Sequence, residues 1–230
     1  MSTKPPSPSL TERRKAATQL DIARAAAELF TERGPDGTTA EDIAHRAGVA
    51  LRTFYRYFRS KQDAVAPLLA GGADRWREQL AAAGPEPGTG LPRLLERSIA
   101  ASLTPADEAG AEGLRWTRGL LRAAAEDPAL RAVWYRVNQE SEERLREVVA
   151  ALAGPGADPL EVRLAAAAAT DAIRIALESW AETETETETG ATGPDAEGWP
   201  DAEGSPAALA VRCLRELTGG MRLFGPDVSE

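Results

Sequence analysis

The fold is decided by residues 38–61, which read TTAEDIAHRAGVALRTFYRYFRSK. Thr39 carries a hydroxyl that can cap the first amides of a helix, and Asp42, three residues later, is the matching acid of a capping box. Gly48 ends this helix, and a second helical segment covers about residues 50–59. Two short helices joined by a turn that contains glycine form the helix-turn-helix layout. The stretch therefore predicts a helix-turn-helix.

The second of these helices has one polar face and one aromatic face. Arg52, Tyr55, Arg56 and Arg59 recur at i, i+3, i+4 and i+7, whereas Phe54 and Phe58 fall on the opposite side. From residue 43 to 62 there are five basic residues and no acid: Arg46, Arg52, Arg56, Arg59 and Lys61. A helix of this kind fits the major groove, where arginine binds guanine through two hydrogen bonds. Charge alone leaves the alternative open, that of a solvated basic face on an ordinary helical bundle.

Helical patterns continue on both sides of this stretch, and period-2 alternation of apolar residues is missing. Thr104, Asp127 and Asp158 each precede a proline, which is the signature of a capped helix start. The pattern predicts nine helices and no sheet, an all-α fold, with helices near 11–33, 39–48, 50–59, from 61, 91–103, 105–126, 128–153, 159–181 and 205–218.

Charge and composition divide the chain into two predicted domains. Residues 1–64 have a net charge of +3, although the chain of 230 residues has a net charge of −9. A basic head on an acidic body suggests a polyanion partner for the head. We expect a DNA-binding domain over 1–64, with a disordered arm at 1–10, and a helical domain over 65–230. Residues 182–205 are acidic and apolar-poor, which predicts a disordered linker.

Several classes of protein are excluded by residue counts. The chain has one cysteine and one histidine, so a disulfide framework or a zinc site with several Cys or His ligands is ruled out. The longest apolar run, residues 164–169, is far shorter than the roughly 20 residues needed to cross a bilayer. We expect a cytoplasmic protein that is not an enzyme, has no cofactor or metal and does not bind membranes.

The sequence resembles the N-terminal signature of the TetR family of bacterial transcription regulators over residues 13–65. The matching positions are Ile22, Ala25, Ala26, Leu29, Phe30, Gly34, Thr38, Thr39, Ile43, Ala44, Ala47, Gly48, Val49, Thr53, Tyr55, Tyr57, Phe58 and Lys61. The resemblance implies a three-helix DNA-binding head fused to a larger helical body that binds a ligand and dimerises. It also implies a homodimer that leaves double-stranded operator DNA when a small-molecule effector binds the body.

The resemblance carries roles to individual residues of the head. Thr39 matches a phosphate contact, and Tyr57 and Lys61 match positions that hold the DNA backbone. Positions near base edges or flanking phosphates are matched by Arg52, Thr53, Tyr55 and Arg56. Two departures matter: Ala50 replaces the usual serine, so the recognition helix lacks its cap, and Leu51 is expected in the core with Phe54 and Phe58.

The body offers residues for a ligand site. Trp116, Trp134 and Trp180 fall on three separate predicted helices, where aromatic residues are usually core. The alternative is an apolar cavity with a few polar groups, for which the candidates are Arg118, Arg122, Asn138 and Arg174. Residues 122–180 also resemble the C-terminal domain type named for the mycofactocin regulator, which implies an acyl-CoA-like ligand. Arg122 or Arg174 would then bind its phosphates.

Together these features predict a ligand-responsive repressor of a palindromic operator. The alanine-rich segment 164–173 and the helix 205–218 are the expected dimer face, with close packing inside one subunit as the alternative. Two rival functions remain: a helical adaptor that docks an acidic protein on Arg52–Arg59, and an all-α enzyme using pocket carboxylates. Neither metal-ligand spacing nor an activated nucleophile supports the enzyme.

Overall fold

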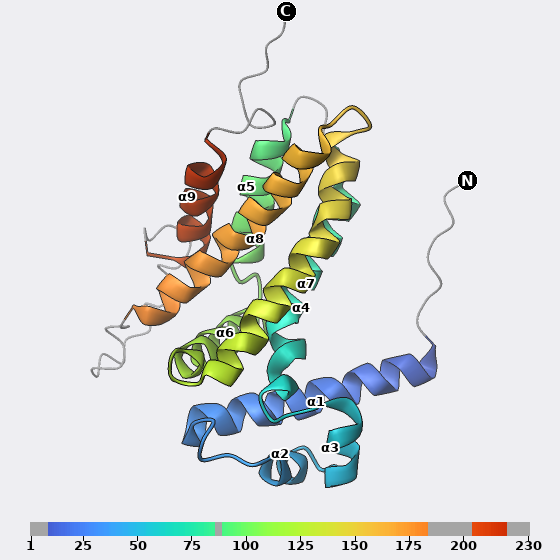
Figure 1. The fold of residues 1–230 in the computed structure, drawn as a ribbon, viewed down its shortest axis with the longest axis vertical. Coiled ribbons are helices and arrows are strands. Elements are labelled where there is room, and N and C mark those ends of the chain that lie inside the picture. The colour runs from blue at the N-terminus through green and yellow to red at the C-terminus, as the bar shows by residue number, and fades with distance from the viewer. Residues whose placement is uncertain (1–8, 86–88, 184–203, 220–230) are drawn as a thin grey trace, which may run out of the picture. The chain divides into compact units, whose positions relative to one another are not determined.

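The computed structural model describes residues 9–85, 89–183 and 204–219, which form nine α-helices, one short 3-10 helix and no strand (Figure 1). The all-α prediction is confirmed for these residues. The chain divides into two compact units, residues 1–68 and 69–230. Most of the predicted arm, residues 1–8, and most of the predicted acidic linker, residues 184–203, lie outside the described residues.

The first unit consists of α1 (Leu10–Arg33), α2 (Ala40–Arg46), α3 (Leu51–Tyr57) and the 3-10 helix η1 (Asp63–Val65). The α1 helix begins at Leu10, inside the predicted disordered arm, because Ser9 and Glu12 form a capping box. The Ser9 Oγ accepts from the Glu12 amide at 3.2 Å, and the Ser9 amide donates to the Glu12 carboxylate at 2.7 Å. The bond from the Ser9 amide stabilises the ionised carboxylate and lowers the pKa of Glu12.

The core of the first unit lies where α1 packs on α2 and η1, and where α2 packs on α3. The expected apolar stripe of α1 is confirmed, since Ile22, Ala26, Leu29 and Phe30 are all buried. A fourth helix does not begin near Lys61 as expected. Ser60 and Asp63 close a turn there through two hydrogen bonds of 3.1 Å, so that α4 (Ala66–Ala83) starts only after η1.

The second unit continues α4 and adds α5 (Leu91–Ser102), α6 (Glu108–Glu126), α7 (Pro128–Ala153), α8 (Pro159–Glu182) and α9 (Pro206–Thr218). Asp127 and Asp158 cap α7 and α8 as predicted, each followed by proline at the first helical position. The predicted start of α6 at Pro105 is wrong. Asp107 is the cap, accepting from the Gly110 amide at 2.8 Å, while the Thr104 hydroxyl donates back to the Ala100 carbonyl of α5.

Packing in the second unit is most extensive between α8 and α9, and α9 also packs on α5 (Figure 1). The small side chains of α8 are buried within this one chain: Ala165, Ala166, Ala168, Ala169, Ala172 and Ala176. These alanines therefore pack inside one subunit, and the dimer face on α8 and α9 stays a prediction. Leucines on the outer surface of these two helices stay exposed: Leu160, Leu164 and Leu217. None of the helices described is long and apolar enough to span a bilayer.

Candidate nucleic-acid interface and ligand site

The α3 helix presents a polar face because its aromatic residues anchor it from behind. Phe54 is fully buried and Phe58 is 6% exposed, with their ring centroids 5.7 Å apart. Tyr55 packs edge-on against Phe54 at 5.3 Å and is still 57% exposed. Arg52, Arg56 and Arg59 are exposed as well. The predicted division of this helix into a buried aromatic side and an exposed basic side is confirmed.

Leu51 is 38% exposed, so its predicted place in the core is wrong. The prediction grouped Leu51 with Phe58 by helical angle, which requires both residues to be helical. Phe58, however, is the C-cap of α3 and has extended backbone, with φ −130° and ψ 142°. It turns into the core by leaving the helix, and Leu51 remains on the outer surface. As expected, Ala50 gives α3 no side-chain cap.

The start of α2 is held by the predicted capping box. The Thr39 Oγ1 accepts from the Asp42 amide at 3.1 Å, and the Thr39 amide donates to the Asp42 carboxylate at 2.9 Å. The Thr39 hydroxyl also donates to that carboxylate at 2.6 Å. These donors lower the pKa of Asp42. The exposed Thr39 therefore fixes the helix start, and its hydroxyl already has two intramolecular partners.

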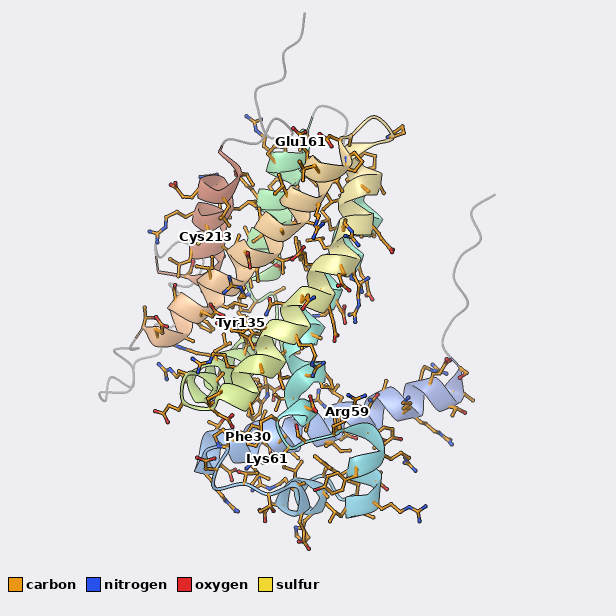
Figure 2. All side chains as sticks on the ribbon, viewed as in Figure 1. Phe30, Arg59, Lys61, Tyr135, Glu161 and Cys213 are labelled. Atoms are coloured by element: carbon orange, nitrogen blue, oxygen red, sulfur yellow. The ribbon has the colours of Figure 1, made fainter. Side chains whose placement is uncertain are left out.

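Lys61 has a structural role that its sequence position did not indicate. Its ammonium donates to the Pro35 carbonyl at 2.7 Å and to the Thr38 carbonyl at 3.0 Å, both in the loop between α1 and α2 (Lys61 is labelled in Figure 2). Thr38 itself is buried, with its hydroxyl toward the Gly34 carbonyl at 2.9 Å. Lys61 thus ties the segment after α3 to the segment that precedes α2, while one of its three donors remains for another partner.

Arg46 is neutralised within the first unit. Its guanidinium binds the carboxylates of Glu28 and Glu32 on α1, each at 3.0 Å. These hydrogen bonds raise the pKa of Arg46, and the bond to Arg46 lowers the pKa of Glu32. Of the five basic residues counted between 43 and 62, Arg46 therefore holds α2 on α1 and contributes little charge to the exposed face.

A cleft of about 390 Å³ lies between the first half of α1 and the end of α3. Its lining consists of Thr11, Arg14, Lys15, Thr18, Arg56 and Tyr57. The Arg56 guanidinium lies over the Tyr57 ring, 4.8 Å from its centroid, and donates to the Tyr57 hydroxyl at 3.2 Å. We call this feature the α1–α3 cleft. Of the residues predicted to contact DNA, it brings together Arg56 and Tyr57.

In the second unit, the predicted ligand residues fall into separate groups. Arg118 and Arg122 of α6 bind the end of α8: the Arg122 Nε donates to the Ala181 carbonyl at 2.9 Å, and both guanidinium groups donate to the Thr183 carbonyl. The Arg118 guanidinium also lies 4.8 Å from the centroid of the Trp180 ring. Two cations thus satisfy the carbonyls at the negative end of a helix dipole.

A second group joins α7 to α8 through Glu178, which the sequence analysis did not single out. One carboxylate oxygen accepts from the Trp134 indole at 2.7 Å, and the other accepts from Arg174 at 2.9 Å. Burial opposes the charge of Arg174, but the bonds and charges of Asp171 and Glu178 outweigh it, so the pKa of Arg174 is raised. Asn138 donates to the Trp134 carbonyl at 2.9 Å. In the sequence, Glu178 could have been found as a glutamate one helical turn after Arg174.

Trp116 stands apart from both groups. Its indole N–H is buried and has no hydrogen-bond partner among the described residues. A second cleft, of about 410 Å³, lies between α5 and α9 and is lined by Ala100, Thr104, Ala207, Ala208, Val211, Arg212, Arg215 and Glu216. None of the seven predicted ligand residues lines this cleft or the α1–α3 cleft.

Comparison with known proteins agrees with this architecture. Residues 22–66, which span the core of the first unit, match the model of "Bacterial regulatory proteins, tetR family". The HTH-type transcriptional regulator TcmR of Streptomyces glaucescens is 30% identical over 156 residues, covering 67% of this chain and 68% of TcmR. The mycofactocin biosynthesis transcriptional regulator MftR of Mycobacterium tuberculosis is 43% identical, but only over 49 residues, 21% of this chain and 25% of MftR.

Among solved structures, the fold is similar to FadR of Thermus thermophilus, a TetR-family transcriptional repressor crystallised with lauroyl-CoA. The TM-score is 0.54 and the identity 21%, and the alignment covers 92% of this chain and 99% of FadR. This likeness concerns the fold, since the identity is low, whereas the match to TcmR extends over two thirds of both chains. The chain belongs to the TetR family of bacterial transcription regulators.

Proposed function

We propose that the protein is a ligand-responsive repressor, which binds a palindromic operator as a homodimer and releases it when a small molecule occupies the helical body. The observation that carries the DNA-binding part is the exposed face of α3, where Arg52 and Tyr55 project from a helix anchored by the buried Phe54. Arginine side chains on an exposed short helix match the hydrogen-bond acceptors of the major groove.

Contacts with the DNA backbone would come from residues around this helix. Lys61 has one donor left after binding two carbonyls, and Thr53 and Tyr57 are half-buried beside the exposed face. Leu51, exposed at the start of α3, offers an apolar contact for a thymine methyl group. Phosphate contacts orient the head, and the side chains of α3 that reach base edges supply sequence preference.

A ligand site in the body is supported by the buried, unpartnered indole N–H of Trp116. A buried donor without a partner costs free energy that a ligand acceptor would recover. Nearby along α6, Arg118 and Arg122 could exchange the α8 carbonyls for the phosphates of an acyl-CoA-like ligand. FadR of Thermus thermophilus was crystallised with such a molecule, lauroyl-CoA.

Dimerisation is supported by the exposed leucines on the outer surfaces of α8 and α9, Leu160, Leu164 and Leu217. A single recognition helix contacts few base pairs, whereas two related by a two-fold axis read both halves of a palindrome. A ligand releases the operator only if it binds more tightly to the conformation that does not fit DNA. Since α4 begins in the first unit and continues into the second, it is the element that carries such a change.

The proposal is tested by fluorescence anisotropy with a duplex taken from the protein's own upstream region. If each protomer makes four phosphate contacts, the log–log slope of affinity against salt is about −7. Lauroyl-CoA should then lower the affinity. If the protein does not bind this duplex at low salt but binds an acidic protein partner through Arg52–Arg59, the rival adaptor function is supported.

A further inference from the structure

We propose that the α1–α3 cleft binds a backbone phosphate of the DNA, and that Arg56 belongs to this phosphate site instead of contacting base edges. The inference rests on the proposed function, because it requires that the first unit bind duplex DNA. It assigns the two arginines that lie one turn apart on α3 to different tasks: Arg56 fixes the position of the head, and Arg52 supplies base preference.

The lining of the cleft has the chemistry of an anion site. Its four α1 residues, at positions 11, 14, 15 and 18, have the spacing i, i+3, i+4 and i+7 and so share one face of the helix. Arg14, Lys15 and Arg56 bring three positive charges to the cleft, and no carboxylate lines it. A phosphate group, which has several acceptor oxygens and a negative charge, is the ligand that such donors suit.

The hydroxyl groups of the cleft are arranged for the same ligand. The Tyr57 hydroxyl accepts a hydrogen bond from Arg56, which leaves its own proton available for an acceptor in the cleft. The Thr18 hydroxyl already donates to the Arg14 carbonyl at 3.0 Å and adds no further donor. The donors offered to a phosphate are therefore those of Arg14, Lys15, Arg56 and Tyr57, together with the Thr11 hydroxyl.

The orientation of Arg56 is what separates it from Arg52. Its guanidinium is held over the Tyr57 ring by a cation–π contact of 4.8 Å and by the hydrogen bond of 3.2 Å. An arginine that reads guanine must instead extend its fork away from the helix toward the base edge. Arg52 is exposed and lines neither of the two clefts, so it can extend in this way.

Electrostatics favours an occupied cleft. None of Arg14, Lys15 and Arg56 forms an ion pair with a carboxylate of the described residues, in contrast to Arg46. Three like charges around one cleft repel each other, and the attraction of a phosphate between them offsets this repulsion, while binding releases counterions of the DNA. Because the phosphodiester is the same at every base pair, these contacts carry no direct sequence information.

The test compares four full-length variants, three that each replace one arginine with glutamine and a fourth, Lys15→Gln, that alters the α1 side of the cleft. Arg56→Gln alters the cleft, Arg52→Gln alters the exposed face, and Arg24→Gln is the matched control, an exposed arginine on α1 outside the cleft. Base preference is measured by selection from a random duplex library. Affinity is measured by anisotropy over a range of salt concentrations, with one selected duplex and one scrambled duplex.

For Arg56→Gln we expect weaker binding to both duplexes, a salt slope smaller in magnitude by about 1.8 for the dimer, and unchanged base preference. Lys15→Gln should behave alike, Arg52→Gln should change the selected base at one position of each half-site, and Arg24→Gln should match the wild type. A changed base preference with an unchanged slope in Arg56→Gln would overturn the inference. The inference would also be overturned if phosphorus NMR showed that the cleft binds free inorganic phosphate but Arg56→Gln left the salt slope of DNA binding unchanged. The cleft would then bind anions without contacting the DNA. A wild type that binds no duplex would overturn the proposed function itself.

Discussion

Replacing Lys61 with methionine removes an ammonium group that joins two parts of the head, while keeping the length and apolar stem of the side chain. Two charge-assisted hydrogen bonds are lost, to the Pro35 and Thr38 carbonyls at 2.7 and 3.0 Å. Each such bond contributes roughly 1.5–3 kcal/mol when water is excluded. Because Lys61 is half-buried, water can replace part of the loss. We therefore expect Lys61→Met to cost the first unit about 2 kcal/mol.

The assay must report on the first unit alone. All five tryptophans follow residue 68, at positions 76, 116, 134, 180 and 199, so indole fluorescence reports on the rest of the chain. Hydrogen exchange of peptides from residues 22–66 is the suitable measurement. If the first unit loses about 2 kcal/mol of stability, the amides that exchange when it opens should exchange about 30-fold faster. Lys15→Met is the control and should change exchange little, since Lys15 is exposed and forms no ion pair with described carboxylates.

The same variant should weaken binding to all DNA sequences alike, because the loop that Lys61 holds leads directly into the cap of α2. Unchanged exchange at residues 34–42, combined with weaker DNA binding, would refute the structural role. Lys61 would then act on DNA alone, and its bonds to the two carbonyls would not persist in solution.

Three further predictions concern caps and the body. Ala50→Ser gives α3 the side-chain cap that it lacks, and should slow hydrogen exchange of α3 in line with about 1 kcal/mol of added stability; no change would mean that the serine hydroxyl does not reach the α3 amides. Because the pKa of Asp42 is lowered in the folded chain, the cap stabilises α2 fully at pH values above the ordinary aspartate pKa. This stabilisation is lost as the pH falls through the lowered pKa. Thr39→Ala should therefore flatten the acid dependence of α2 exchange, and an equally steep dependence would contradict this cause. Glu178→Leu leaves the Trp134 indole without its acceptor, which should cost about 2 kcal/mol in thermal unfolding followed by fluorescence. The matched control is Glu147→Leu, at an exposed position of α7, which should cost far less, and an equal loss in both variants would contradict the role of Glu178.

Local signals predicted the elements of this fold well. The Thr39–Asp42 capping box and the Asp-Pro starts of α7 and α8 lie where the sequence places them, because a cap depends on residues within one turn. The start of α6 was missed because Thr104 had a competing local partner, the Ala100 carbonyl of the preceding helix. Leu51 was misplaced because the helical angle was extended to Phe58, beyond the end of α3.

The functional residues were predicted by pattern, but their contacts were not. Lys61 binds carbonyls 26 and 23 residues away, and Glu178 accepts from Trp134, 44 residues away. Separations of this size carry no periodicity, so only the folded chain reveals them. The same holds for Arg14 and Arg56, which lie far apart in sequence and line one cleft. The sequence alone therefore could not distinguish an arginine that contacts phosphate from one that contacts bases.

The most direct test of the account is a hydroxyl-radical footprint of the full-length protein on a duplex selected for tight binding. Two copies of the exposed α3 face should protect two patches related by a two-fold axis. Their centres should lie one helical turn, about 34 Å, or a multiple of it apart. A single protected patch, or no protection at low salt, would contradict the claim that a dimer reads DNA through α3.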